Sequence, residues 1–378
     1  MTTIEMDSCE RVMRRFAAVI ALCAALVLIT APGHAAASGF VGVDPFSARC
    51  DADASGGNCL TTKDLQRMRH ANVKFARCLF PWPNVQPVKG GYHWKSIDAI
   101  VGALASRGIR VLPDLVSTPL WVEETYNTPP VDTRKARREW RNFLKAAVAR
   151  YGPGGRYWTD PDLYPSQYPR GPAKPVHTWQ IWNEPNLRTG VQGMPAGDYV
   201  RLVRISHRAI PAADPGAKIL LGGMPGYVRV RAWVYLNKLY EHRGFKRSFD
   251  SVALHPYAGT KHAIRLQLKR MRRVMRRHHD ARSHLWITEL GWGSKRPDQT
   301  TPINKGLRGQ KRMLKRTFPY LQHHHRRWRL SHVFWFRWRD PAPGTPGCKF
   351  CSSSGLFRHS QKPKPVWRAF KRVTAARR

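Results

Sequence analysis

Residues 179–186 read Trp179-Gln-Ile-Trp-Asn-Glu184-Pro-Asn, and residues 286–292 read Trp286-Ile-Thr-Glu289-Leu-Gly-Trp. Each stretch is an apolar, tryptophan-containing run that ends in a glutamate. Burying a carboxylate beside indole rings is costly unless the carboxylate is paired or has a function. The two stretches therefore predict two strands whose C-terminal ends carry chemically important carboxylates.

Strand-like runs alternate with amphipathic stretches along the rest of the chain. We expect strands at 40–43, 73–80, 109–115, 178–183, 218–223, 251–255, 285–290 and 333–338. We expect helices at 65–71, 97–107, 135–151, 196–213, 231–243, 264–279 and 306–323. Strands separated by helices pair in parallel through right-handed crossovers. The pattern predicts an α/β chain with a single (β/α)8 TIM barrel over residues 38–378.

A doubly wound open sheet is the alternative fold for this pattern. It is less favoured because no glycine-rich phosphate loop follows the first predicted strand. The Pro-, Gly- and Ser-rich stretch 340–354 follows the last predicted strand. In a barrel the loop after a strand lies on the catalytic face, so we expect this stretch to border the site.

The N-terminus has the pattern of a targeting segment. Three arginines between positions 11 and 15 precede an apolar run over 16–31, and alanines follow at 35–37. This arrangement is typical of a secretory signal peptide. A membrane anchor is the alternative, but the run is shorter than the roughly 20 residues that span a bilayer. We predict that residues 1–37 are removed and that the protein is secreted.

The cysteines fit an exported protein. The close pairs Cys50/Cys59 and Cys348/Cys351 are plausible disulfides in an oxidising compartment. Cys348-x-x-Cys351 could instead be half of a zinc site, but no second Cys or His pair lies at matching spacing. Cys78 lies inside an apolar strand pattern and is predicted to be a buried thiol outside any disulfide.

The chain is strongly basic, with 65 Lys and Arg against 24 Asp and Glu and a formal net charge of +41. Such a charge favours anionic partners, among them anionic cell-wall polymers. The basic runs keep apolar residues at helical spacing, which indicates solvated helix faces. No nucleic-acid partner is expected, since export and the absence of a recognition motif argue against one. His323-His-His325 fits a solvated basic helix better than a metal site, because consecutive side chains point to different sides.

Two carboxylates at the ends of barrel strands suit one particular chemistry. Catalytic groups of TIM barrels lie at the C-terminal ends of the strands. Glycoside hydrolysis needs one carboxyl group to protonate the leaving oxygen and another to meet the anomeric carbon. Glu184 and Glu289 are therefore the candidate catalytic pair, and this chemistry requires no cofactor and no metal.

The motifs around these glutamates resemble those of the retaining clan A glycoside hydrolases, of the cellulase-like family 5 and xylosidase-like family 39 type. Ile181-Trp-Asn-Glu184-Pro-Asn is similar to their fourth-strand motif and Ile287-Thr-Glu289-Leu-Gly-Trp to their seventh. Arg77-Cys-Leu-Phe-Pro-Trp resembles their second strand, Asp250-Ser-Val-Ala-Leu-His255-Pro-Tyr257 their sixth, and Phe334-Trp-Phe-Arg-Trp338 their eighth. The resemblance covers most of residues 38–378.

The resemblance implies a role for each matching position. Glu184 would be the general acid/base, holding a proton near neutral pH, and Glu289 the ionised nucleophile. Arg77 and Tyr257 would orient Glu289. The carboxyl groups would lie about 5–5.5 Å apart.

Four further positions would then bind the substrate. Asn183 would donate to the sugar 2-hydroxyl, and His255 would bridge substrate and carboxylates. Trp338, and less securely Trp335, would form an aromatic floor under the ring.

Other interpretations of the same residues stay open. Glu184 and Glu289 could be structural ion-pair partners in an arginine-rich protein. A catalytically silent barrel that binds carbohydrate at the cell surface would also keep both carboxylates. The sequence does not identify the sugar, the linkage or the choice between exo and endo action.

Overall fold

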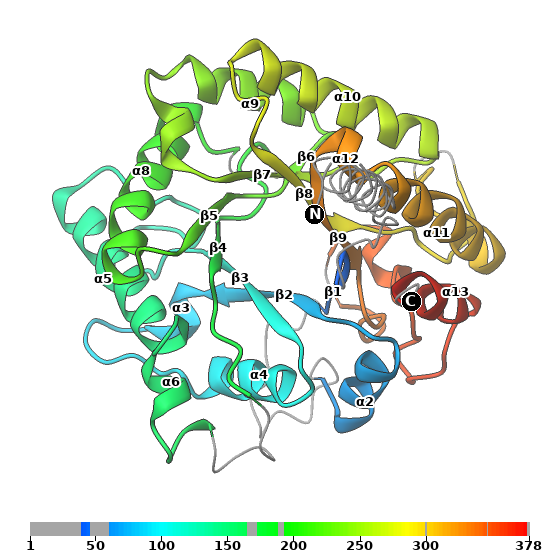
Figure 1. The fold of residues 1–378 in the computed structure, drawn as a ribbon, viewed down its shortest axis with the longest axis horizontal. Coiled ribbons are helices and arrows are strands. Elements are labelled where there is room, and N and C mark those ends of the chain that lie inside the picture. Colours follow the sequence, from blue (N-terminus) through cyan, green and yellow to red (C-terminus); the bar gives the residue numbers. More distant parts are fainter. Residues whose placement is uncertain are drawn as a thin grey trace, which may run out of the picture. The chain divides into compact units, whose positions relative to one another are not determined.

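The computed structural model describes residues 39–45, 60–164, 172–187, 193–298, 301–345 and 347–375 (Figure 1). The predicted signal peptide and the predicted Cys50–Cys59 disulfide lie outside these residues, so both stay predictions. In the described part of the chain, no helix has the length and apolar character needed to cross a membrane.

A closed parallel sheet forms the centre of the fold. The strands follow the order β5-β4-β3-β2-β1-β9-β8-β7-β6, and β5 also pairs with β7, which closes the barrel. The barrel has eight strand positions, and the fifth is occupied by two short strands, β5 and the two-residue β6. The predicted single (β/α)8 barrel is thereby confirmed. The strands are β1 Val41–Asp44, β2 Phe75–Pro81, β3 Arg110–Val116, β4 Thr178–Ile181, β5 Lys218–Leu221, β6 Met224–Pro225, β7 Ser251–His255, β8 His284–Leu290 and β9 Leu330–Phe336.

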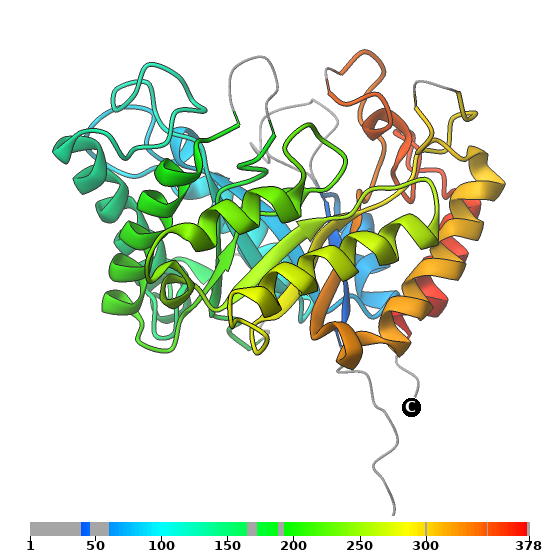
Figure 2. The ribbon, with the colours of Figure 1, turned by 90° about the horizontal axis from the view of Figure 1, so that it is seen from above.

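Helices surround the barrel and connect its strands (Figures 1 and 2). Several begin where a side-chain oxygen can accept from a free backbone N–H group. Thr61 and Asp64 form a capping box, and Thr133 and Thr260 cap the helices that follow them. The helices are α2 Thr62–His70, α3 Trp82–Val85, α4 Lys95–Ala105, α5 Arg134–Tyr151, α6 Arg156–Thr159, α8 Ala196–Ala213, α9 Ala232–Glu241, α10 Lys261–Arg277, α11 Gly306–His323, α12 His325–Trp328 and α13 Pro365–Thr374, with 3-10 turns at Phe245–Ser248 and Cys351–Ser353.

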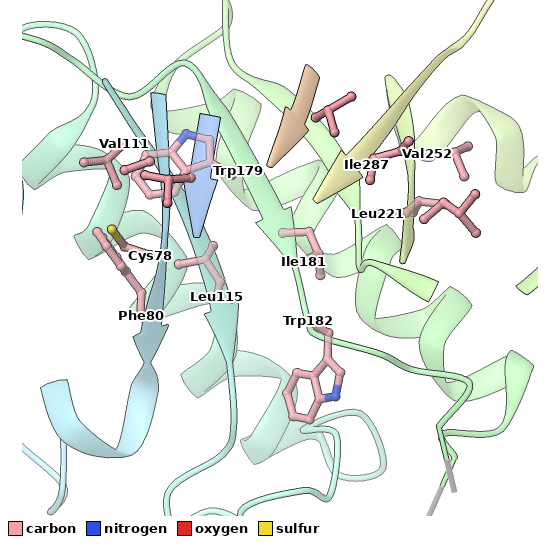
Figure 3. Packing of buried hydrophobic residues seen from close by; sticks show 14 of the residues in the cluster. Cys78, Phe80, Val111, Leu115, Trp179, Ile181, Trp182, Leu221, Val252 and Ile287 are labelled. Carbon is pink, nitrogen blue, oxygen red and sulfur yellow. The ribbon is translucent and has the colours of Figure 1, made fainter. Parts of the chain in front are cut away.

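Side chains alternate between the two faces of each strand, so the barrel has one apolar region inside it and another between sheet and helices. One inward layer is filled by a side chain from each of six strands: Phe75, Leu112, Leu220, Ala253, Trp286 and Phe334. The neighbouring positions, such as Cys78 and Phe80 of β2, belong to the larger core between sheet and helices. Figure 3 shows these two side chains on the same side of β2. The period of two therefore directs position 77 of the same strand into the barrel.

Most strand and helix boundaries fall within a few residues of those expected from the sequence. The strand at 251–255 and the helices at 196–213 and 306–323 coincide with β7, α8 and α11. The last strand is displaced: it covers Leu330–Phe336 rather than 333–338. Arg337 and Trp338, the predicted last residues of this strand, therefore lie after it. The alternation of side chains along a strand does not apply to them.

The described cysteines follow the prediction. Cys348 and Cys351 form a disulfide, with their Cα atoms 5.1 Å apart. Cys78 is buried in β2 and takes no part in a disulfide. The disulfide closes a small turn in the loop after β9, so this loop does not use its thiols as zinc ligands.

Candidate active site

Arg77 is the centre of the polar network at the barrel mouth. It projects inward from β2 and is 1% exposed. Its Nη1 lies 2.5 Å from Asp44 Oδ2 and 2.7 Å from Glu289 Oε1. Its Nη2 donates to Asp114 Oδ2 at 2.6 Å and to Asn183 Oδ1 at 2.7 Å, and its Nε donates to Gln180 Oε1 at 2.7 Å. One guanidinium thus ties together strands β1, β2, β3, β4 and β8.

Three carboxyl groups lie around Arg77. Burial by itself lowers the pKa of Arg77, but the carboxylates of Asp114, Glu289 and Asp44 outweigh burial and raise it. Burial raises the pKa of Asp114 to about 6; Arg77 opposes that rise and Glu289 adds to it. Arg337 is a second buried guanidinium, and its charge interacts with Asp44 and Glu289. The three carboxyl groups are thus partly balanced by two guanidinium groups, and Asp114 is the carboxyl group whose pKa burial raises.

Glu289 lies one residue before the end of β8, and both of its carboxylate oxygens accept hydrogen bonds. Oε1 accepts from Arg77, and Oε2 accepts from the Tyr257 hydroxyl at 2.8 Å. Burial and the neighbouring Glu289 raise the pKa of Tyr257 well above its ordinary value, so this hydroxyl stays a donor. Two donors, one of them a guanidinium, therefore fix the position of this carboxylate.

Glu184 lies just after β4 on a tightly folded backbone. Trp182 and Glu184 have φ angles of 69° and 47°, in the left-handed region that side chains other than glycine rarely adopt. The Glu184 amide donates to Gly223 O at 3.1 Å, which ties this turn to the segment between β5 and β6. Such backbone strain persists where the surrounding structure fixes it, and it is common at functional sites.

His255 joins the two glutamates from β7. Its Nδ1 lies 2.8 Å from Glu184 Oε1 and 3.6 Å from Glu289 Oε2, and its Nε2 lies 2.9 Å from Thr288 Oγ1. Oxygens of Glu184 and Glu289 and a nitrogen of His255 all lie within 4.8 Å of one another. Among the described residues this is the one cluster with the spacing of a metal site. Its hydrogen bonds account for the spacing without an ion.

Asn183 is oriented by the same network. Its Oδ1 accepts from Arg77, which leaves its Nδ2 as a donor for a ligand. The structure therefore brings Glu184, Glu289, Arg77, Asn183, His255 and Tyr257 together. Their positions agree with the sequence-based site, and their roles stay predictions.

A family model of known glycoside hydrolases matches part of this chain. The family model described as beta-galactosidase, glycoside hydrolase family 42, matches residues 56–188. This segment contains Arg77, Asn183 and Glu184 but stops before Glu289.

Solved glycoside hydrolases have a similar fold. A family 39 enzyme from Bacteroides cellulosilyticus has a TM-score of 0.64 and 20% identity, covering 89% of this chain and 63% of that one. A monomeric beta-xylosidase from Caulobacter crescentus has a TM-score of 0.58 and 17% identity, covering 84% of this chain and 65% of that one. A GH5_18 protein from Streptomyces cattleya in complex with GlcNAc has a TM-score of 0.61 and 15% identity, covering 89% and 79%. The chain thus spans less than two thirds of the first two proteins.

The fold is therefore similar to that of solved glycoside hydrolases of families 39 and 5. The resemblance expected from the two glutamate motifs is confirmed at this level. At such identities the similarity establishes the architecture, and the reaction is argued below from the residues of this chain.

The two tryptophans predicted as a clan A sugar floor do not reach the mouth. Trp335 is 0% exposed and packs in the outer core against Trp292 and Phe318. Trp338 is 1% exposed and donates to Asp64 Oδ1 at 2.9 Å. Trp335 points outward because β9 alternates, and Trp338 lies beyond the strand end. This pair is therefore corrected: neither indole faces the carboxylates.

Other aromatic side chains occupy that side of the mouth. Phe336, Phe350 and Tyr257 form a buried cluster, with the Tyr257 and Phe350 rings 4.9 Å apart. Phe350 comes from the 340–354 loop, which borders the site as expected. The strand period signals Phe336, since it lies two residues after the inward Phe334 of β9, but no local pattern places Phe350.

Tyr227 is a further site residue that sequence reasoning missed. It follows β6, is 54% exposed, and meets Tyr257 edge-to-face at 5.9 Å. Partial burial and the charges of Glu184 and Glu289 raise its pKa. An exposed ring beside the carboxylate pair can stack on a sugar. The sequence does not indicate this position, because Gly226-Tyr227 lies in a loop without a strand or helix pattern.

The supporting residues Asp44, Asp114, Gln180 and Thr288 were also missed. All are buried polar side chains at or near strand ends. The signal that could have found them is polarity within apolar strands, as for Asp114 in Arg-Val-Leu-Pro-Asp114-Leu-Val. The histidines at 323–325 lie at the α11–α12 junction, and His323 is exposed, as expected for a basic helix.

Proposed function

We propose that the chain is a retaining O-glycoside hydrolase acting on an oligo- or polysaccharide, with Glu289 as nucleophile and Glu184 as general acid/base. The carrying observation is that a carboxylate oxygen of Glu184 lies within 4.8 Å of one of Glu289. Retaining glycosidases hold their carboxyl groups about 5–5.5 Å apart, whereas inverting ones leave about 6.5–9.5 Å for a water. The close pair supports double displacement.

The hydrogen bonds support this assignment of roles. Glu289 accepts from two donors, which fix the direction of its carboxylate. Among the described residues Glu184 has a side-chain hydrogen bond only with His255, and its side chain is 15% exposed against 8% for Glu289. The better-held carboxylate suits attack, and the more accessible one suits proton exchange with leaving group and water.

The reaction would proceed in two balanced steps. Glu184 donates its proton to the glycosidic oxygen as Glu289 attacks the anomeric carbon, giving a glycosyl ester and a free alcohol. Glu184 then takes a proton from water, the resulting hydroxide attacks the same carbon, and Glu289 leaves as carboxylate. Asn183 Nδ2 would donate to the sugar 2-hydroxyl, and Tyr227 would cover an apolar face of the ring.

Replacement of the nucleophile tests the proposal. Glu289→Ala should lower kcat on a chromogenic glycoside panel by about 10⁴-fold or more, because no covalent intermediate can form. Glu241→Ala, at an exposed position on α9, is the matched control and should keep wild-type rates. Product released by the wild type should carry the anomeric configuration of the substrate, measured by NMR.

Three outcomes would contradict all or part of the proposal. Wild-type rates in Glu289→Ala would remove the nucleophile assignment. If no glycoside released product while sugars still raised the Tm, the chain would be a carbohydrate-binding barrel without turnover. Product with inverted configuration would refute double displacement while leaving hydrolysis itself intact.

A further inference from the structure

The basic charge of the chain is concentrated on one side of the barrel. Residues 261–378 contain 31 Lys and Arg but four Asp and Glu, whereas residues 39–260 contain 31 against 17. The excess lies on α10, α11, α12 and α13, which pack as neighbours on one side of the barrel (Figures 1 and 2). These four helices carry 18 Lys and Arg, 16 of them exposed, and no Asp or Glu. Their outward faces are called the basic wall below.

The charges of the basic wall are not neutralised by the protein. Among the described residues none of its cations forms an ion pair with an acidic side chain, whereas on α5 and α8 Arg138 pairs with Glu139 and Arg201 with Asp198. The acids of the same chain segment are engaged elsewhere. Asp280 accepts from Tyr240 and Ser283, Asp340 pairs with Lys364, and Glu289 lies in the site.

Charge crowding on α10 is unfavourable to the isolated protein. Lys269, Arg273 and Arg276 follow one another on its exposed face at spacings of four and three. Like charges at these spacings destabilise a helix. The buried Arg272 shows the crowding: burial lowers its pKa, and so do the neighbouring Arg329 and Arg276. An extended anion on this face would relieve the repulsion.

We infer that the basic wall binds the carboxylate-bearing chain of an acidic polysaccharide beside the catalytic mouth, an inference that rests on the proposed function for its carbohydrate partner. Thirteen of the 18 cations are arginines, whose planar guanidinium groups match carboxylate oxygens. The helices α10 and α11 directly follow β7 and β8, the strands that carry His255 and Glu289. Each of these helices runs back from the strand end that it follows, so the first turns of α10 and α11 form the end of the wall nearest the mouth. A polymer that lies along the wall can reach the site at that end.

The surface fits a polysaccharide better than a nucleic acid. Single-stranded nucleic acids bind through aromatic side chains that stack on bases. The exposed large hydrophobic residues of the described chain are Val88, Leu120, Tyr126, Tyr227 and Val234, and none lies on the four helices. Among the described residues the wall therefore offers charge and hydrogen-bond donors with no exposed large hydrophobic side chain.

Binding to a matched pair of polymers tests the inference. The full chain carrying Glu289→Gln, which prevents turnover, is titrated with polygalacturonate and with its methyl ester, which has the same backbone without the charge. We expect binding to the acid form, weakening steeply with salt, and none to the ester. Adding Lys269→Gln, Arg273→Gln and Arg276→Gln on α10 should weaken binding about tenfold by removing three cations that would contact carboxylates of the polymer.

The matched control removes three exposed charges from the opposite part of the chain. Lys135→Gln, Arg141→Gln and Lys145→Gln on α5 lower the net charge equally and should change Kd by less than about twofold. Equal losses in both triple variants, equal binding to the ester, or tighter binding to single-stranded DNA would each overturn the inference. In the background with Glu289 intact, kcat on a small neutral glycoside should be unchanged by the α10 substitutions. Polymer binding by the basic wall and turnover of the neutral glycoside are thus measured separately, so either proposal can fail without the other.

Discussion

The hydroxyl of Tyr257 illustrates how one contact can be separated from folding stability. Tyr257→Phe removes the donor to Glu289 Oε2 but keeps the ring in its cluster with Phe350. We expect kcat to fall about 10–100-fold, since one of the two donors that position Glu289, the proposed nucleophile, is lost. Steady-state kinetics and Tm should show loss of rate with little loss of stability.

A second buried tyrosine provides the control. The Tyr235 hydroxyl donates to the Met194 carbonyl and lies outside the carboxylate network. Tyr235→Phe should lower Tm slightly and leave kcat unchanged. A comparable rate loss in both variants would show that Tyr257 acts only through packing.

Tyr227 offers a test of the sugar-binding face. Tyr227→Ala removes the exposed ring beside Glu184 and Glu289 and should raise KM about tenfold, since a stacked ring is worth on the order of 1 kcal/mol. Tyr227→Phe should keep most of the affinity. Tyr126→Ala, equally exposed on the loop after β3, is the control on a monosaccharide glycoside. An unchanged KM in Tyr227→Ala would exclude the ring from the site.

At the level of elements, the fifth strand position, split into β5 and β6, supports the turn that carries Glu184 through its backbone. Gly223, between β5 and β6, accepts the Glu184 amide and leaves room for His255. A Cβ at this position would lie 1.9 Å from His255 Nε2. The fifth strand position is therefore interrupted at Gly223, where the close approach of His255 requires a residue without a Cβ.

Gly223→Ala should displace His255 and with it the link to Glu184. We expect at least a tenfold loss of kcat together with a lower Tm, because the clash involves a fully buried ring. Gly197→Ala in α8 is the control, since its Cβ would meet His242 at an ordinary 3.7 Å. That change should be neutral or stabilising in thermal unfolding. Full activity in Gly223→Ala would contradict the proposed role of His255.

Across the whole molecule, the barrel interior below the site makes stability depend on pH. His332 of β9 packs against Phe75 and Trp286 and lies 3.1 Å from the Gly39 carbonyl through Nδ1. Burial lowers its pKa to about 4; the hydrogen bond to Gly39 opposes the shift, and Arg110 adds to it. The unfolded chain takes up this proton near pH 6.5, well before the folded one.

The protein should consequently lose stability as the pH falls from about 6.5 to about 4, because the unfolded state binds more protons in that window. The contribution of His332 is at most about 1.4 kcal/mol per pH unit. His332→Asn keeps a donor for Gly39 without titrating, so its unfolding free energy should depend less on pH there. Denaturant unfolding at several pH values measures the difference, and parallel curves for both proteins would refute it.

Local patterns in the sequence determined the alternating strands and helices, the strand ends that carry Glu184 and Glu289, and the pairing of Cys348 with Cys351. These features depend on neighbours in the chain, and closing any parallel barrel brings all C-terminal strand ends to one mouth. Only the tertiary structure decided that Asp44, Asp114 and Gln180 converge on Arg77, that Tyr227 and Phe350 reach the mouth, and that Trp335 and Trp338 point away. Those outcomes depend on strand register and on how the chain leaves each strand, which long-range closure fixes and local periodicity does not encode.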